Sequence, residues 1–196
     1  MLELTELLSR VGDGSILGKP KLSVMHGLLK KVESIEGDTA EFGVYYGGTS
    51  KFIHLALPSK QHHMFDTFLG LPKPDTTIDV HEQGGFYSKI ESVIDVMEPA
   101  RNVHFHVGEF PESLAFVPRA KSLRFAFVHI DFDLYAGTYA AVEYTYHRMT
   151  KGGVMVFDDY KWIDTPGVTL ALDQFFEDKP ENMQSYEKYQ TFVVKQ

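Results

Sequence analysis

Residues 124–160 read RFAFVHIDFDLYAGTYAAVEYTYHRMTKGGVMVFDDY, and this segment sets the architecture of the chain. Two apolar runs, 125–130 and 154–157, flank a segment of helical character at 136–149, which a Gly-Gly pair separates from the second run. Apolar runs of this length, rich in Val, Ile and Phe, are typical of strands that are buried on both faces of a parallel sheet. The segment therefore predicts a strand, a helix and a second strand.

Both predicted strands end in aspartates. Asp131 and Asp133 follow the first strand, and Asp158 and Asp159 follow the second. Because ligands of open α/β sheets bind outside the carboxyl ends of the strands, neighbouring strands would bring these side chains together. Two unit charges about 4 Å apart repel by roughly 4 kcal/mol at an effective dielectric near 20. Such a cluster takes up protons or holds a cation, unless the residues only form polar turns.

Mg²⁺ is the cation that these residues favour. Carboxylate oxygens suit hard ions, and the chain contains no cysteine that would favour zinc. A lysine ammonium lodged in the place of the ion would remove the metal from this scheme.

Composition indicates one soluble globular domain, 1–196, without a nucleic-acid or membrane partner. The net charge is −8, and no stripe of lysine and arginine interrupts it. No apolar run approaches the roughly 20 residues that span a bilayer, and the first residues lack the features of a signal peptide. We expect a cytoplasmic protein, with a homodimer as one alternative for its oligomeric state.

The first 36 residues predict a helical region ahead of an α/β core at 37–196. Segments 2–10 and 22–35 have apolar residues at helical spacing. Between them, 11–20 contains three glycines and a proline and is expected to be a loop. We interpret this loop as a tether in preference to a lid over an acceptor.

Residues 39–50, TAEFGVYYGGTS, predict a strand, a glycine-rich turn and the start of a helix. The spacing from Gly43 to Gly48 is Gly-x-x-x-Gly-Gly, which differs from the Gly-x-Gly-x-x-Gly of dinucleotide binders. A turn of this kind lets a ligand approach the backbone, and the helix N-terminus offers free N–H groups. Glu41 lies in an otherwise apolar strand, so it needs a cationic ligand group, such as an amino-acid ammonium, or a lysine or arginine partner.

Two further strands are expected at 61–65 and 103–107. Asp66, at the tip of the first, is placed to accept hydrogen bonds from a ribose, and Gly108-Glu109 after the second offers backbone for an adenine ring. The connection 67–87 has the length of a functional lid or a mobile segment.

His62, His63 and His81 lack regular metal spacing, and we interpret them as surface residues. His104 and His106 form a His-x-His pair of a kind that can bind metal, but we expect them on a solvated or partly covered face of their strand.

The C-terminal part predicts a helix at 168–177 and a hairpin formed by 183–186 and 191–194. Strands that alternate with helices and close in a hairpin indicate an α/β fold. We therefore expect a doubly wound, mostly parallel sheet with helices on both faces and a C-terminal antiparallel hairpin.

Three blocks resemble the class I S-adenosylmethionine-dependent methyltransferases and, more narrowly, the macrocin O-methyltransferase (TylF-type) family. GDTAEFGVYYGG at 37–48 is similar to the first cofactor motif, and FDTFLGLP at 65–72 is similar to the second. DFDLY at 131–135 with DDY at 158–160 is similar to the metal and catalytic motif. The resemblance implies a Rossmann-like fold and transfer of a methyl group from S-adenosylmethionine to a hydroxyl of a sugar or another small-molecule natural product.

The resemblance also implies roles for individual residues. Glu41 would bind the methionine ammonium and Asp66 the ribose. Mg²⁺ would be held by Asp131, Asp158 and Asp159. Asp133 would be the general base, with Asp131 beside it in the catalytic pair. The full expected cofactor-binding set is Glu41, Gly43, Tyr45, Gly47, Gly48, Thr49, Asp66, Thr67, Phe68, Gly108 and Glu109.

Two other functions stay open at this point. Asp131-Phe132-Asp133 also fits the Asp-x-Asp metal motif of a nucleotide-sugar glycosyltransferase, a function that leaves Glu41 and the glycine turn without a role. The other is a cofactor-binding domain whose catalytic function has lapsed, which the complete acidic set disfavours.

Overall fold

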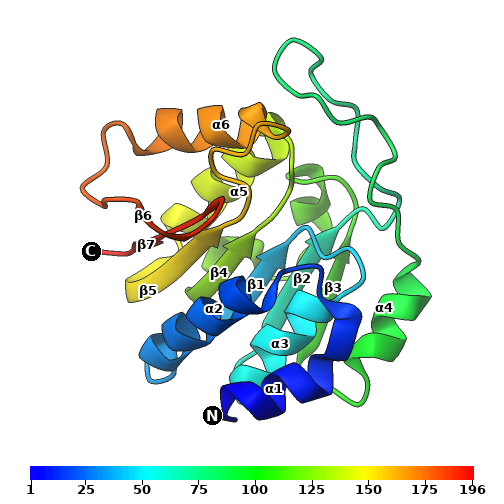
Figure 1. Ribbon diagram of the computed structural model, residues 1–196, viewed down its shortest axis with the longest axis vertical. Coiled ribbons are helices and arrows are strands. Elements are labelled where there is room, and N and C mark those ends of the chain that lie inside the picture. Colours follow the sequence, from blue (N-terminus) through cyan, green and yellow to red (C-terminus); the bar gives the residue numbers. More distant parts are fainter.

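The computed structural model describes residues 1–196 as a seven-stranded sheet between two layers of helices (Figure 1). The strands are β1 (Asp38–Phe42), β2 (His62–Asp66), β3 (Val103–Val107), β4 (Phe125–Ile130), β5 (Met149–Phe157), β6 (Gln184–Glu187) and β7 (Gln190–Val194). The α-helices are α1 (Leu4–Val11), α2 (Lys19–Val32), α3 (Gly48–Ala56), α4 (Ile90–Met97), α5 (Tyr135–Tyr146) and α6 (Pro166–Phe176). Short 3₁₀ helices lie at Gly12–Gly14, Glu112–Phe116 and Ala120–Ser122.

The strand order is β3-β2-β1-β4-β5-β7-β6. The first five strands are parallel to their neighbours, whereas β7 is antiparallel to both β5 and β6. The chain begins at the middle of the sheet and winds outward first to one side and then to the other, so the carboxyl ends of β1 and β4 meet at the point where ligands bind. The predicted fold class, including the C-terminal hairpin, is confirmed.

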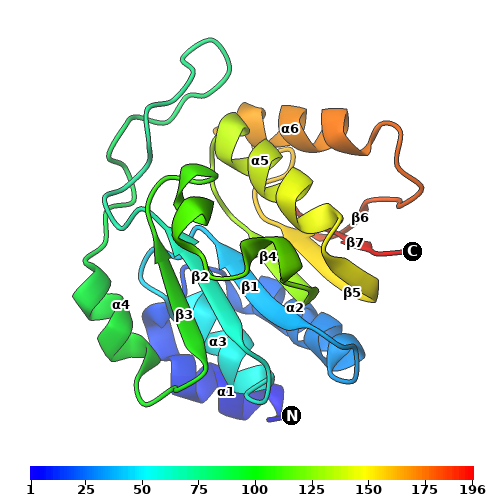
Figure 2. The ribbon, with the colours of Figure 1, turned by 180° about the vertical axis from the view of Figure 1, so that it is seen from behind.

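A separate apolar core lies on each face of the sheet. Helices α1 to α4 cover one face, and α5 and α6 cover the other (Figures 1 and 2). All six residues of β4 are buried, and neighbouring residues divide between the cores, with Phe127 on the first and Val128 on the second. This is the burial that a near-continuous apolar run predicts.

The helix and strand around the Gly-Gly pair have other boundaries than expected. The helix ends at Tyr146, and β5 already begins at Met149, so Gly152 and Gly153 lie inside the strand. The register between β4 and β5 is irregular here, and Gly152 has a positive φ of 83°. A Cβ at Gly153 would come within 2.9 Å of the carbonyl oxygen of Ala126. The pair therefore forms an irregularity that lets β5 continue.

The interpretation of His62 and His63 as surface residues is wrong, because β2 lies inside the sheet and both side chains are buried. His63 joins a polar chain, with its Nε2 3.2 Å from Asp38 Oδ2 and its Nδ1 2.9 Å from Nε2 of His106. His106 is buried as well, while His104 is exposed and His81 is half-buried. Polar partners on the neighbouring strands make this burial tolerable.

This buried histidine chain predicts acid sensitivity of the fold. Burial, together with the neighbouring His63 and His104, lowers the pKa of His106 to about 4, below the unfolded value of about 6.5. The stability that the fold gains from burying a neutral His106 is therefore complete above pH 6.5 and is lost as the pH falls toward 4. Because part of the site is screened by solvent, we expect the free energy of unfolding to decrease by about 2 kcal/mol across this window.

Urea unfolding at several pH values measures this dependence. His106→Gln should make the pH dependence of the free energy of unfolding shallower, whereas the same change at the exposed His147 should leave it unaltered. An equally steep dependence in both variants would show that the acid sensitivity arises elsewhere.

Candidate active site

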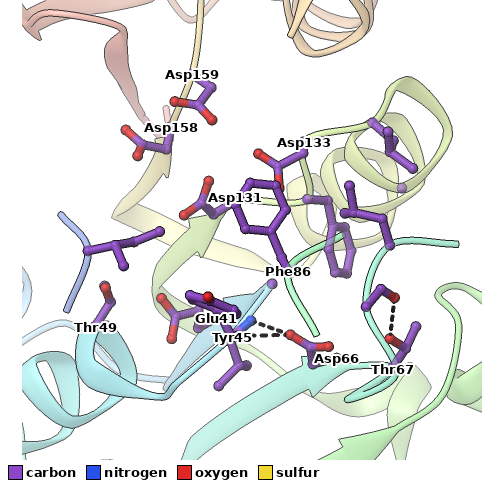
Figure 3. A pocket seen from close by; sticks show the side chains of 18 of the residues that line it. Glu41, Tyr45, Thr49, Asp66, Thr67, Phe86, Asp131, Asp133, Asp158 and Asp159 are labelled. Carbon is purple, nitrogen blue, oxygen red and sulfur yellow. Dashed lines mark hydrogen bonds between the residues drawn. The ribbon is translucent and has the colours of Figure 1, made fainter. Parts of the chain in front are cut away.

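A cavity of about 430 Å³ opens at the carboxyl ends of the central strands. Figure 3 shows Glu41 and Asp66 on one side, Asp158 and Asp159 on the other, and Asp131 and Asp133 between them. This arrangement follows the strand order, because these residues belong to or follow β1, β2, β4 and β5. The four aspartates of β4 and β5 therefore lie at neighbouring strand tips, as predicted.

The glycine-rich turn after β1 brings the backbones of β1 and β4 close together. Gly43 has a φ of 87°, and a Cβ there would overlap the carbonyl oxygen of Asp131. The N–H of Asp131 donates to the carbonyl of Phe42 at 2.7 Å, and the N–H of Gly43 donates to that of Phe65 at 2.9 Å. Glycine is needed at position 43 for both its φ and its lack of a side chain.

Asp66 holds the conformation of the same turn. Its Oδ2 accepts hydrogen bonds from the N–H groups of Val44 at 2.7 Å and Tyr45 at 3.0 Å, and its Oδ1 accepts one from Phe68 at 2.8 Å. These bonds fix the carboxylate at the cavity wall (Figure 3). Asp66 thus has a structural role in the turn in addition to the ribose-binding role expected for it.

Glu41 is buried, with 1% of its surface exposed. Its Oε1 is 2.9 Å from Nδ1 of His129, and its Oε2 accepts a hydrogen bond from the hydroxyl of Ser50. The alternative of a lysine or arginine partner is therefore not realised. The sequence did not single out His129 or Ser50, because strand pairing and the packing of α3 bring them to Glu41 only in the folded chain.

Three carboxylates at the tips of β4 and β5 converge. Oxygen atoms of Asp131, Asp133 and Asp159 all lie within 4.8 Å of one another. Burial and then repulsion from neighbouring aspartates raise the pKa of Asp131 and that of Asp133 well above the usual range, and the same two causes raise the pKa of Asp159 to about 6. The cluster therefore has an excess of negative charge that protons or a cation would relieve.

Asp158 has a different partner from the other three aspartates. The ammonium Nζ of Lys21 lies 2.6 Å from its Oδ1 and 4.0 Å from Oδ1 of Asp159, and Nε2 of Gln190 donates to Asp158 Oδ1 at 3.0 Å. A lysine ammonium, the feature expected to exclude the ion, therefore lies against one member of the expected metal set, so in this structure Asp131, Asp158 and Asp159 do not form a free ligand set. The structure groups Asp133 with Asp131 and Asp159 and pairs Asp158 with the lysine.

Sequence reasoning missed Lys21 because α2 was expected to begin at residue 22. The helix begins at Lys19, with Pro20 in its first turn, a position that favours proline. The segment 14–18 ahead of it lines the cavity, so the loop interpreted as a tether forms part of the wall. A Cβ on Gly48 would overlap the backbone of Gly14, which shows how closely this segment packs on the start of α3.

Most of the expected cofactor-binding residues line the cavity. They are Glu41, Gly43, Tyr45, Gly48, Thr49, Asp66, Thr67, Gly108 and Glu109. Gly47 and Phe68 do not: Gly47 precedes α3 with a φ of 81°, and the Phe68 ring packs in the apolar cluster beneath α4.

The long connection between β2 and α4 folds over the cavity. The N–H of Leu71 donates to the carbonyl of Gly85 at 2.7 Å, and the ring of Phe86, which lines the cavity near Asp131 (Figure 3), lies edge to face with that of Tyr45 at 5.7 Å. The buried Asp79 fixes the connection, because its Oδ1 accepts a hydrogen bond of 2.9 Å from the N–H of Tyr135 at the start of α5. Residues 70–88 therefore contribute directly to the wall of the site.

The strand order, the glycine turn after β1 and the acidic tips of β2, β4 and β5 are those of the class I, Rossmann-like methyltransferase fold. The family model of macrocin O-methyltransferase (TylF) matches residues 11–186. The chain belongs to this family of S-adenosylmethionine-dependent O-methyltransferases, which also sets aside the glycosyltransferase alternative.

Individual relatives agree with this assignment. The 8-demethyl-8-(2,3-dimethoxy-alpha-L-rhamnosyl)-tetracenomycin-C 4'-O-methyltransferase of Streptomyces olivaceus is 28% identical over 179 aligned residues, with 76% of this chain and 67% of that protein covered. The O-methyltransferase NovP has a TM-score of 0.78 at 20% identity, covering 93% of this chain and 82% of its own. The calicheamicin methyltransferase CalS11 has a TM-score of 0.76 at 19% identity, covering 97% and 90%. At these identities the two structures demonstrate a shared fold.

None of the helices has the length and apolarity required to cross a lipid bilayer.

The close approach at Gly43 predicts a strong effect of a single methyl group. Gly43→Ala should lower the free energy of unfolding by about 3 kcal/mol, because alanine is strained at this φ and its Cβ overlaps the Asp131 carbonyl. Gly84→Ala is the matched control, since Gly84 has a φ of 82° but no atom within 4 Å of a Cβ. It should cost only about 1 kcal/mol. Equal losses in urea unfolding would mean that backbone strain alone, and not the contact with β4, requires the glycine.

Proposed function

We propose that this enzyme transfers the methyl group of S-adenosylmethionine to a hydroxyl of a sugar carried by a natural product, and that Mg²⁺ assists the transfer. The proposal is carried by one observation: a cavity that joins the glycine turn and Glu41 to the aspartates at the tips of β4 and β5. The sugar acceptor is inferred from relatives. One is named as a rhamnosyl-tetracenomycin methyltransferase, and CalS11 as a TDP-rhamnose 3'-O-methyltransferase.

The cofactor would lie over β1 and β2. Glu41 is a buried carboxylate at the base of the glycine turn, held by His129 and Ser50, and it would receive the methionine ammonium. Asp66 would accept the ribose hydroxyls, because its position at the tip of β2 matches that of acids that bind ribose in this class of sheet. Gly108 and Glu109, at the end of β3, would line the adenine side.

The acidic cluster fits a divalent cation. It offers only oxygen ligands, and burial, followed by repulsion from neighbouring carboxylates, raises the pKa values of Asp131 and Asp159. Asp131, Asp158 and Asp159 would hold the ion, with Lys21 as the competing partner of Asp158. When bound, Mg²⁺ would lower the pKa of an acceptor hydroxyl and orient it.

Asp133 would remove the proton from the acceptor hydroxyl. It lies beside Asp131 and Asp159 in the cavity, and a pKa above the usual carboxylate range makes it a stronger base. Its backbone has a φ of 60°, a conformation that non-glycine residues seldom adopt. In this conformation the side chain lies in the cavity wall, in the loop after β4. The rest of the rate enhancement would come from holding the acceptor oxygen close to the methyl carbon of the cofactor.

Calorimetry and turnover of paired variants test this function. S-Adenosylmethionine should bind the wild type, and methyl transfer to TDP-rhamnose or to a rhamnosylated tetracenomycin should cease in excess chelator. Asp133→Asn should lower kcat by about 10²- to 10⁴-fold, because it removes the base, while cofactor affinity stays within about threefold. The exposed Asp95→Asn is the control and should behave as the wild type. Parallel loss of turnover and cofactor affinity in Asp133→Asn would refute the role of base, and full activity in chelator would refute the metal.

The pairing of Lys21 with Asp158 makes a separate prediction about metal affinity. Lys21→Met removes a positive charge and frees the Asp158 carboxylate, so Mg²⁺ should bind about tenfold more tightly. A tenfold gain is a modest part of the Coulomb energy between two charges at the distance of Lys21 from Asp158. Lys31→Met, at an exposed position of the same helix, removes the same charge away from the site and should have no effect. The dissociation constants are measured by titration of the metal-free protein. Unchanged or weaker binding in Lys21→Met would show that the lysine and the ion do not compete.

A further inference from the structure

Two aromatic side chains line the cavity on the side away from the proposed cofactor residues. Trp162 follows β5 and Tyr189 lies in the turn between β6 and β7. Phe157 pairs with Thr191 across β5 and β7, so the hairpin turn lies at the carboxyl end of β5, next to Asp158 and Asp159. Across the edge of the sheet, the aspartates of β4 and β5 thus separate the Glu41 side from the aromatic side.

The two rings form a stacked pair. Their centroids are 6.0 Å apart, and their planes differ by 21°. Both side chains are half-buried although they come from loops, and both contribute to the cavity wall. Flat apolar rings that face a cavity are suited to the apolar face of a sugar or to an aromatic group.

Hydrogen bonds connect the backbone of Trp162 and the residue after Tyr189 to the aspartates of β5. The backbone N–H of Trp162 donates to the carbonyl of Asp159 at 3.1 Å, and the buried hydroxyl of Thr165 donates to the same carbonyl at 3.0 Å. Next to Tyr189, Gln190 donates to the Asp158 carboxylate at 3.0 Å. The aromatic pair is therefore held in a fixed position relative to the acidic cluster.

Building on the proposed function, we propose that Trp162 and Tyr189 form the acceptor subsite, and that the sugar or an aromatic group of the acceptor stacks on the pair. The hydroxyl of this acceptor then faces Asp133 and Asp159.

Trp162 is the single tryptophan of the chain, so its fluorescence reports on this subsite directly. The probe is phenyl α-L-rhamnopyranoside, titrated into the wild-type protein with S-adenosylmethionine present. We expect a saturable change of emission. A titration that leaves the emission unchanged would overturn the assignment of Trp162 to the acceptor subsite.

Calorimetry on variants tests the role of the two rings. Trp162→Ala and Tyr189→Ala should each weaken binding of the phenyl glycoside by up to about tenfold, the range for loss of one aromatic contact, and Trp162→Phe should restore most of it. Phe116→Ala is the control, because Phe116 is 84% exposed and does not line the cavity.

Affinity for S-adenosylmethionine separates this inference from the proposed function. It should stay unchanged in all these variants, and its absence in the wild type would refute the proposed function itself. Unchanged glycoside affinity in Trp162→Ala, accompanied by a lower melting temperature, would show that the pair only joins the hairpin to the loop and would overturn the acceptor subsite.

Discussion

The site depends on the close approach of two backbones, where Gly43 at the end of β1 lies against the carbonyl of Asp131 at the end of β4. No side chain fits between them, so the glycine turn and the acidic cluster become walls of one cavity. Asp66 then holds the turn through the N–H groups of Val44 and Tyr45. Methyl transfer requires the donor and the acceptor to lie next to each other. The close approach of β1 and β4 places the two proposed binding regions side by side and so makes this arrangement possible.

Unbalanced negative charge is the second constraint on the site. Asp131, Asp133 and Asp159 crowd together in a buried place, and Lys21 reaches from α2 to offset part of their charge through Asp158. Burial raises the pKa of several carboxylates here, and such an arrangement reduces the stability of the fold. It is typical of positions that serve binding or catalysis. The lysine thus gives the acid-rich site a partial internal counter-charge.

The central strands and their acidic tips could be predicted from sequence, because buried parallel strands have apolar runs and their polar ends stand out. Lys21 could not, since 137 positions separate it from Asp158 and only the packing of α2 brings them together. Burial of His62 and His63 was missed for a related reason: their polar partners lie on other strands. Trp162 and Tyr189 likewise come from separate loops, so no local pattern marks them as a pair.

The N-terminal segment has a consequence for any shortened version of this enzyme. Gly14 packs against Gly48 at the start of α3, and Lys21 binds Asp158 on the opposite side of the cavity. A truncation that started at β1 would retain every recognisable cofactor motif yet open the cavity along one flank and strip Asp158 of its counter-ion. The smallest unit that preserves the walls of the cavity therefore includes the segment 14–18 and α2, although the sequence motifs begin only after them.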